Sequence, residues 1–128
     1  MSLFFLNAYE KVPRDKISDY EQLSAFTDQK VQEIEPGMLV HVQTVHAETD
    51  DHVTYCWHEI YASYEDLRNH LDNKYVAKHI RKLNDGLLHG KVEVYIYCDW
   101  DEVQKDPFKE AVPGLDLKFI EIKNGYFR

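Results

Sequence analysis

Histidines and a few carboxylates set among aromatic residues are the parts of this sequence that could do chemistry. Seven histidines occur in 128 residues, and an imidazole changes its protonation near neutral pH. They are His41, His46, His52, His58, His70, His79 and His89. No HxH, HExxH or HxxxH spacing joins them, so a metal site would need assembly from distant segments. We therefore expect no metal ligands and treat the histidines as candidates for proton transfer.

Glu59 is a carboxylate among apolar and aromatic residues, next to Ile60 and between Trp57 and Tyr61. A carboxylate in such surroundings must be paired or desolvated. A hydrogen bond to a tyrosine hydroxyl, a helix N-terminus or an arginine explains it more simply than catalysis. Trp57 and Tyr61 share its strand face if the alternation is regular, and both could equally be core residues.

Strands are expected wherever short runs alternate or are rich in aromatic residues. These runs cover 3–9, 38–46, 53–61 and 91–98. His41 and Gln43 lie on the less aliphatic face of the second run, and Asn7 lies in the first between aromatic residues. A helix between these two strands has Ser18 as its expected N-cap and ends at Pro36-Gly37.

A second helix is predicted from apolar residues at helical spacing after the third strand. Ser63 is its expected N-cap, the pair Asp72-Asn73 should kink or interrupt it, and Gly86 or Gly90 should end it. His70 and His79 lie on or beside its apolar stripe. A histidine there is either functional or satisfied by backbone groups.

The order strand, helix, strand, strand, helix, strand predicts an α+β fold with a ferredoxin-like split βαβ core and an antiparallel sheet. A short helix over 101–111, a break at Pro113-Gly114 and a strand over 115–122 follow. We expect a single domain over 1–128, with its core at about 3–99 and a C-terminal extension at about 100–128. The last strand must pair at a sheet edge or cross to a partner subunit, and its aromatic tail favours the second.

Charge and cysteine content exclude several classes of protein. Fifteen Lys and Arg against twenty-three Asp and Glu give a net charge of -8, so a nucleic-acid partner is not expected. The apolar run 3–6 is too short for a signal peptide core or a membrane span, which predicts a cytoplasmic protein without a membrane partner.

Cys56 lies on the third predicted strand and Cys98 on the fourth. In a ferredoxin-like sheet the strands usually lie in the order 4-1-3-2, so the first strand separates these two. Their Cα atoms should lie roughly 9–10 Å apart, beyond disulfide reach.

Two helices cover only one face of such a sheet. The other face would carry Asn7, His41, Gln43 and large aromatic side chains, which are too apolar to stay wet. Dimerisation through this face is the simplest way to remove these side chains from water.

Four motifs in the block 35–97 carry a resemblance to a known family. They are Glu35-Pro36-Gly37-Met38-Leu39, the run Tyr55–Tyr61 ending in His58-Glu59-Ile60-Tyr61, Ser63-Tyr64-Glu65-Asp66-Leu67, and the run Asn69–Val76 containing His70-Leu71. Together they resemble the antibiotic biosynthesis monooxygenase family of the dimeric α+β barrel superfamily. The sequence departs from the family at Tyr75-Val76, where His-Phe is usual, and in the extension beyond Asp99.

The resemblance implies a homodimer in which the sheets of two protomers pack together and each protomer keeps a ligand pocket between sheet and helices. It also implies a cofactor-independent monooxygenase that oxidises a small aromatic or quinol-type compound with dioxygen. Such chemistry needs a base or hydrogen-bond partners that stabilise a phenolate or enolate, and a dry aromatic pocket. The expected catalytic residues are His70 and His41. The expected substrate-binding residues are Asn7, Trp57, Glu59, Tyr61, Tyr75 and His79.

Two alternatives remain open at this point. The pocket could bind a small apolar molecule without catalysis, in a dimer that performs no reaction. Less favoured is a heme-binding or heme-degrading protein, with His79 or His70 as axial ligand and Asn7 near the distal side.

Overall fold

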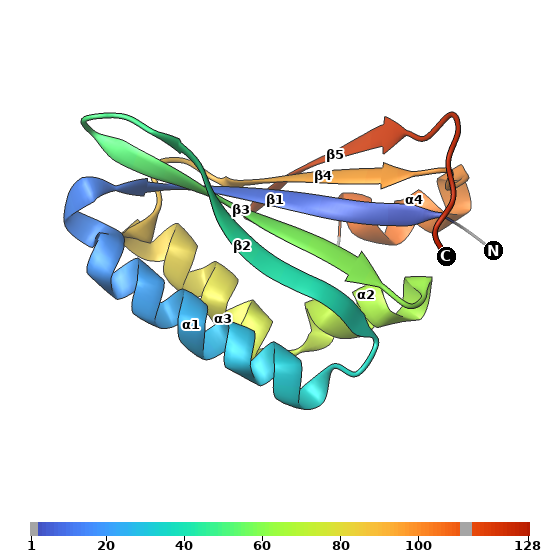
Figure 1. Cartoon of the computed structure of the whole chain (residues 1–128), viewed down its shortest axis with the longest axis horizontal. Coiled ribbons are helices and arrows are strands. Elements are labelled where there is room, and N and C mark those ends of the chain that lie inside the picture. The colour runs from blue at the N-terminus through green and yellow to red at the C-terminus, as the bar shows by residue number, and fades with distance from the viewer. Residues whose placement is uncertain (1–2, 111–113) are drawn as a thin grey trace.

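A five-stranded sheet with helices on one face makes up the structure, a computed structural model that describes residues 3–110 and 114–128 (Figure 1). The elements are β1 (Phe4–Pro13), η1 (Arg14–Lys16), α1 (Ile17–Ile34), β2 (Met38–Glu48), β3 (His52–Tyr61), α2 (Tyr64–Asp72), α3 (Lys74–Lys82), η2 (Leu83–Leu87), β4 (Val92–Cys98), α4 (Glu102–Glu110) and β5 (Leu115–Glu121). The predicted α+β class and split βαβ order are confirmed. The predicted helix end at Ala111 and the Pro113 half of the predicted break lie outside the described residues.

The strands lie in the order β2-β3-β1-β4-β5, so the predicted central order 4-1-3-2 is confirmed. All pairs are antiparallel except β4 and β5, which run parallel from Val92 beside Leu115 to Cys98 beside Glu121. The expectation that the last strand crosses to a partner is therefore wrong. With α4 in the connection between them, β5 returns to the same sheet, and Leu115, Leu117 and Phe119 pack on the core there.

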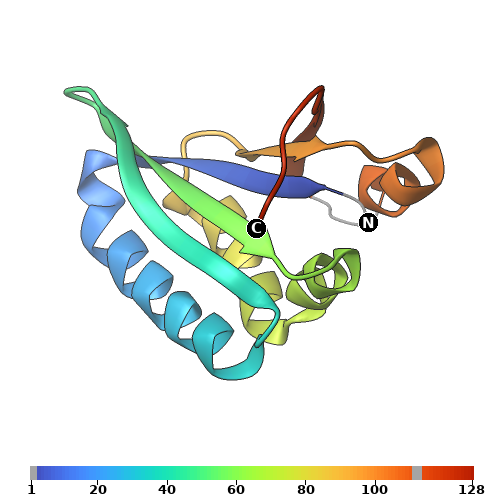
Figure 2. The same cartoon turned by 45° about the vertical axis from the view of Figure 1, so that its right-hand side comes forward.

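Successive side chains of β1 point alternately to the two faces of the sheet, and this alternation decides which of them pack against the helices. Phe4, Leu6, Ala8, Glu10 and Val12 are buried, while the residues between them are half-buried. Figures 1 and 2 show α1, α2 and α3 beneath this face of the sheet, and no helix over the other face among the described residues. The core lies between the buried strand residues and these helices.

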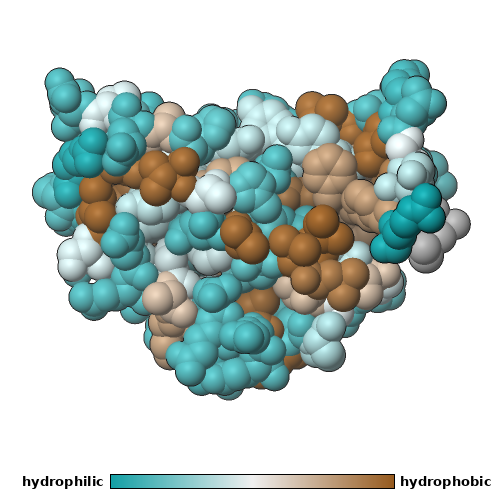
Figure 3. Space-filling model, in the orientation of Figure 1, coloured by the Kyte–Doolittle hydropathy of each residue, from teal (hydrophilic) through white to brown (hydrophobic). Residues whose placement is uncertain are grey.

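The uncovered face of the sheet is aromatic. Phe5 stacks on Tyr97 with ring centroids 4.6 Å apart, and Tyr9 meets Tyr95 edge-on at 5.5 Å. Val42 on the edge strand β2 is half exposed. Figure 3, in the orientation of Figure 1, shows brown apolar patches among teal hydrophilic groups on a side of the molecule that includes both the sheet and the helices. The C-terminal tail lies against part of this face, where Phe127 meets Phe5 with ring centroids 6.1 Å apart (Figure 2). We call this side of the sheet, which no helix covers in the described structure, the open face.

His41 and Gln43 do not lie on the open face, contrary to the sequence expectation. They pair across the sheet with Glu59 and Trp57, whose side chains point to the helices. Their polar groups find partners on α1, where His41 bonds Asp28 and Gln43 donates to the Tyr20 hydroxyl. These hydrogen bonds pair the polar groups of His41 and Gln43, which an entirely apolar core would leave without partners.

The second helical segment follows its predicted capping chemistry. The Ser63 hydroxyl accepts a hydrogen bond from the Asp66 backbone N–H, and the helix breaks at Asn73, whose side chain accepts from the Tyr75 N–H. The chain leaves the helix at Gly86, where φ is 101°, a value that glycine tolerates best.

The expected cap of the first helix is wrong. Ser18 is the second residue of α1, and the helix instead follows the short 3-10 turn η1, with Lys16 at the N-cap and no side-chain cap bond. The turn already orients the chain for a helical start, so capping by Ser18 is not needed.

Both cysteines are buried and free, and they lie on β3 and β4, which flank β1. The prediction that they form no disulfide is confirmed. Within the described ranges, no helix is both long enough and apolar enough to cross a membrane.

Candidate functional site

A cavity of about 80 Å³ lies between the helix-facing side of the sheet and α2, α3 and α4. Its walls are mostly apolar, with Leu6 and Ala8 from β1 and Val76 and Ile80 from α3 among them. Six of the residues predicted from the sequence line it: His41, Trp57, Glu59, Tyr61, His70 and His79. An apolar cavity of about 150 Å³ is known to accommodate benzene. The cavity is therefore smaller than one aromatic ring requires, and a ring can enter only if wall side chains move.

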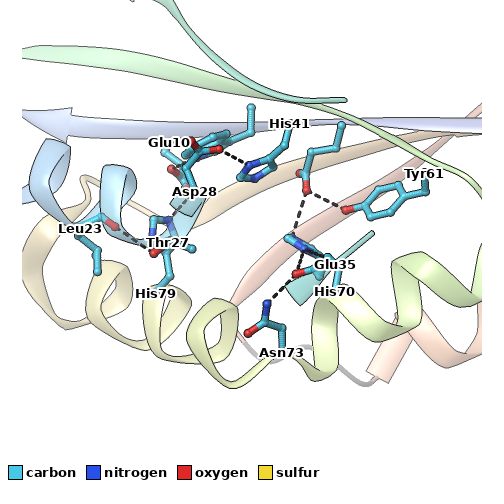
Figure 4. Close-up of polar contacts among 12 residues, drawn as sticks. Glu10, Leu23, Thr27, Asp28, Glu35, His41, Tyr61, His70, Asn73 and His79 are labelled. Carbon is cyan, nitrogen blue, oxygen red and sulfur yellow. Dashed lines mark hydrogen bonds and ion pairs between the residues drawn. The ribbon is translucent and has the colours of Figure 1, made fainter. Parts of the chain in front are cut away.

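His70 on α2 lies between two carboxylates at one end of the cavity (Figure 4). Its Nδ1 lies 2.9 Å from Oε1 of Glu35, and its Nε2 lies 3.1 Å from Oε1 of Glu59. The Tyr61 hydroxyl donates to the same Glu59 oxygen at 2.7 Å, and the Asn73 amide donates to Glu35 at 2.7 Å. We call these five residues the His70 cluster. It joins the end of α1, β3 and α2, and its residues are all buried.

Both ring nitrogens of His70 face carboxylate oxygens, so both must carry a proton for the cluster to be satisfied. Burial alone would lower the pKa of His70, but attraction to Glu59 and hydrogen bonds to both carboxylates raise it to about 9. Burial alone would raise the pKa of Glu59, but the His70 cation outweighs it and lowers that pKa below its ordinary value. Burial and the Glu59 charge hold the pKa of Tyr61 well above its usual range. At neutral pH the cluster is an ionised Glu59, a cationic His70 and a neutral Tyr61.

His41 has a different environment, on β2 beside this cluster. Its Nδ1 lies 2.8 Å from Oδ1 of Asp28, and its ring stacks on Trp57 with centroids 4.3 Å apart. Its Nε2 makes no hydrogen bond to any residue that the structure describes. When Nδ1 carries the proton, Asp28 fixes that tautomer and leaves the Nε2 lone pair free. Asp28 thus fixes the orientation of the His41 imidazole. His41 lines the cavity, and its Nε2 has no hydrogen-bond partner among the described residues.

A second buried cluster surrounds Glu10 on β1. One carboxylate oxygen accepts hydrogen bonds from the Tyr20 hydroxyl and, at 2.9 Å, from the Trp57 indole N–H. The other lies 3.4 Å from Nε2 of His79, whose Nδ1 lies 3.0 Å from the Thr27 hydroxyl. Burial and the Glu10 charge raise the pKa of Tyr20. This cluster ties β1, α1, β3 and α3 together and forms a second polar part of the cavity wall (Figure 4).

Two of the predicted substrate-binding residues lie outside the cavity. Asn7 is an odd-numbered residue of β1 and faces the open side of the sheet, where its side-chain oxygen contacts Nδ1 of His58 at 3.1 Å. Tyr75 lies on the outer side of the helices, edge-on to Phe26 and beneath the Lys30 ammonium. Neither side chain can contact a guest in this cavity without a rearrangement of the fold.

Sequence reasoning missed Glu10, Glu35 and Thr27 as partners of the functional histidines. A signal existed for Glu10, because it occupies an inward-facing position of a strand whose other inward residues are apolar. Glu35 opens one of the motifs singled out above, but its contact with His70 joins residues 35 positions apart. Only the packing of the end of α1 against α2 creates that contact.

The predicted heme ligands do not fit a heme iron. Both ring nitrogens of His70 and both of His79 are engaged by other side chains, and Asn7 lies on the opposite face of the sheet. Across residues 3–110 and 114–128, no group of three or more His, Cys, Asp or Glu side chains is arranged to hold a metal ion.

Comparison with known proteins places this fold among solved structures. No family model and no curated protein matches the sequence. A candidate antibiotic biosynthesis monooxygenase from Caulobacter crescentus CB15 superposes with a TM-score of 0.65 at 25% identity, over 73% of this chain and 85% of that one. A similar protein from Nitrosomonas europaea gives 0.61 at 17%, over 74% and 96%.

MupZ from Pseudomonas fluorescens matches more of the chain, with a TM-score of 0.71 at 18% identity over 99% of this chain and 94% of that one. The match extends through α4 and β5, so the C-terminal extension is shared with a solved structure. The resemblance of this chain to the antibiotic biosynthesis monooxygenase family is confirmed by the structures from Caulobacter crescentus and Nitrosomonas europaea.

Proposed function

We propose that this protein is a cofactor-independent monooxygenase that acts on a small aromatic or quinol-type compound in the cavity. The observation that carries the proposal is His41, an imidazole oriented by Asp28 with a free Nε2 on the wall of a mostly apolar cavity. A base in that position can remove a proton from a phenolic or enolic hydroxyl. The family resemblance supports the same reaction class.

The resulting anion is electron-rich enough to transfer one electron to dioxygen. Recombination of the substrate radical with superoxide forms a carbon–oxygen bond. The attacked carbon is a CH₂ group in the keto form of the phenol or enol. Loss of water from the hydroperoxide leaves a carbonyl at this carbon, so that CH₂ and O₂ give C=O and H₂O. The protein supplies proton transfer at His41 Nε2 and a site with little water.

His70 is assigned a positioning role in this proposal. It is protonated at neutral pH and both of its N–H groups are committed to Glu35 and Glu59, so it has no lone pair with which to take a proton. Of the two histidines that the sequence singles out for catalysis, the geometry favours His41 as the base.

We also propose that a second copy of the chain covers the open face. Phe5, Tyr9, Tyr95 and Tyr97 present aromatic surface there, beside the half-exposed Val42, and an apolar surface of this kind is typical of an interface. The homodimer that the resemblance implies uses the same face, and it leaves the cavity on the opposite side of each sheet.

Oxygen uptake in the presence of quinol compounds tests the proposal, with no metal or flavin added. The His41→Gln variant should lose about 100-fold or more in kcat, because glutamine cannot act as a base. His46→Gln is the matched control, since His46 lies on the same strand but contacts Tyr9 on the open face. Equal turnover of His41→Gln and wild type would refute the base assignment. Binding without any oxygen uptake would instead support a non-catalytic binding protein.

A further inference from the structure

An open groove with cationic walls lies beside the cavity, between the end of α3 and the beginnings of β4 and β5. Its volume is about 1150 Å³. Asp85 is the only acidic side chain among the described residues that line it. Its cationic residues are Lys78, Arg81, Lys82 and Lys91. We call this the basic groove.

The four cations of the basic groove form no ion pair within the described part of the chain. The chain has twenty-three acidic residues against fifteen basic ones, so its composition does not favour unpaired cations that gather in one place. Arg81 and Lys82 lie in the last turn of α3, where positive charge also stabilises the helix end. Lys78 precedes that turn and Lys91 comes from another segment, so this effect does not explain them. The groove therefore carries an excess of positive charge that a bound anion would balance.

Asn84 adds an uncharged donor to the wall of the groove. Its amide lies against the backbone at Gly114, where an added Cβ would lie 2.3 Å from Nδ2 of Asn84. Gly114 also has a φ of 91°, a value that glycine adopts at little cost. This approach of η2 to the start of β5 closes one end of the groove and leaves the amide beside the cations.

The basic groove adjoins the cavity on three segments of the chain. Ile80 on α3 lines both of them. Lys91 of the groove directly precedes Val92 of the cavity, and Gly114 of the groove directly precedes Leu115 of the cavity. A guest can therefore occupy the two at the same time.

The charges of the two regions are opposite in sign. Glu10 and Glu59 are buried in the cavity wall, whereas the groove outside it is cationic. A negative charge is repelled by the buried carboxylates and attracted by the groove. A guest with one charged end is thus oriented with its apolar end in the cavity and its negative end in the groove.

We propose that the basic groove binds a phosphate group of a guest whose apolar ring enters the cavity. A phosphate monoester carries about two negative charges at neutral pH and three acceptor oxygens, whereas a carboxylate carries one charge and two oxygens. Four cations that face one carboxylate match the phosphate better, and the guanidinium of Arg81 can bind it in a bidentate manner. This inference rests on the proposed function only for the use of the cavity as the reaction site. It names the substrate class, a ring compound with a phosphate group away from the hydroxyl that His41 deprotonates.

Calorimetric titration of the wild-type protein with three probes tests the inference. The probes are phenyl phosphate, inorganic phosphate and benzoate. Phenyl phosphate should bind about tenfold or more tightly than the other two, because inorganic phosphate has no ring to bury and benzoate carries less charge. Its Kd should also rise with salt concentration. Benzoate that binds as tightly would overturn the choice of phosphate, and inorganic phosphate that binds as tightly would overturn the link to the cavity.

A pair of double variants tests the location of the anion. Arg81→Gln combined with Lys82→Gln should raise the Kd of phenyl phosphate about tenfold or more. The control combines Lys16→Gln with Lys74→Gln, which changes the net charge equally at two residues that do not line the groove, and it should leave the Kd unchanged. Equal effects of the two double variants, or an unchanged Kd in a folded groove variant, would overturn the assignment.

The binding and oxygen-uptake results are separate. Phenyl phosphate binding in a protein that shows no oxygen uptake would refute only the monooxygenase proposal. Oxygen uptake with a neutral quinol, in a protein that does not bind phenyl phosphate, would refute only the phosphate site.

Discussion

Replacement of His70 by glutamine offers a quantitative test of the cluster at the cavity wall. In the folded protein the pKa of His70 is about 9, against an ordinary value of 6.5 for the unfolded chain. A raised pKa contributes stability that is complete below pH 6.5 and is lost as the pH rises through 9. The difference corresponds to about 3 kcal/mol of unfolding free energy.

Urea unfolding at pH 6, 7.5 and 9.5 measures this contribution. The free energy of unfolding of the wild type should fall by about 3 kcal/mol between the first and last of these values. His70→Gln should remove most of this fall, and it should also be less stable at pH 6, because Glu35 and Glu59 lose their cation. The control His46→Gln should keep the wild-type slope. A wild type whose stability is flat over this range, or a His70→Gln variant with the wild-type slope, would refute the reasoning.

Three further predictions concern the cap, the buried carboxylate of β1 and the open face. Ser63→Ala should lower the free energy of unfolding by about 1 kcal/mol through loss of the α2 cap, and an unchanged urea midpoint would contradict this. Tyr20→Phe should cost about 2 kcal/mol in the same assay, because Glu10 loses a donor, and a loss below experimental error would count against that bond. Val42→Asp should convert the proposed dimer to a monomer in light scattering, whereas Val103→Asp on the outer surface of α4 should not, and equal behaviour of the two variants would exclude the open face as the interface.

Local sequence patterns predicted the elements of this fold well. The alternating run at 91–98 gave β4, and the serine at position 63 and the asparagine at position 73 marked helix boundaries through their own side-chain hydrogen bonds. Each of these signals depends on residues a few positions apart. The start of α1 was mispredicted because a preceding 3-10 turn, which has no strong sequence signature, orients the chain there.

The site depends on contacts that local patterns do not contain. The Glu59 carboxylate was expected to bond a tyrosine hydroxyl, a helix N-terminus or an arginine. Of these three it bonds a hydroxyl, that of Tyr61, two residues away on the same strand. Its ion pair with His70 and the pairing of Glu10 with His79 join distant segments, and they form only when the helices dock on the sheet. The position of His41 was mispredicted because a polar side chain on β2 fits either face, and the partner on α1 decides which face it occupies.

The central claim is that the cavity beside His41 is where a substrate is bound and deprotonated. A crystal structure of the protein soaked with a quinol compound under nitrogen tests this claim most directly. The account predicts a ring in the cavity with one oxygen within about 3 Å of His41 Nε2. A ring bound only on the open face, or a cavity that stays empty in a protein that turns the same compound over, would contradict it.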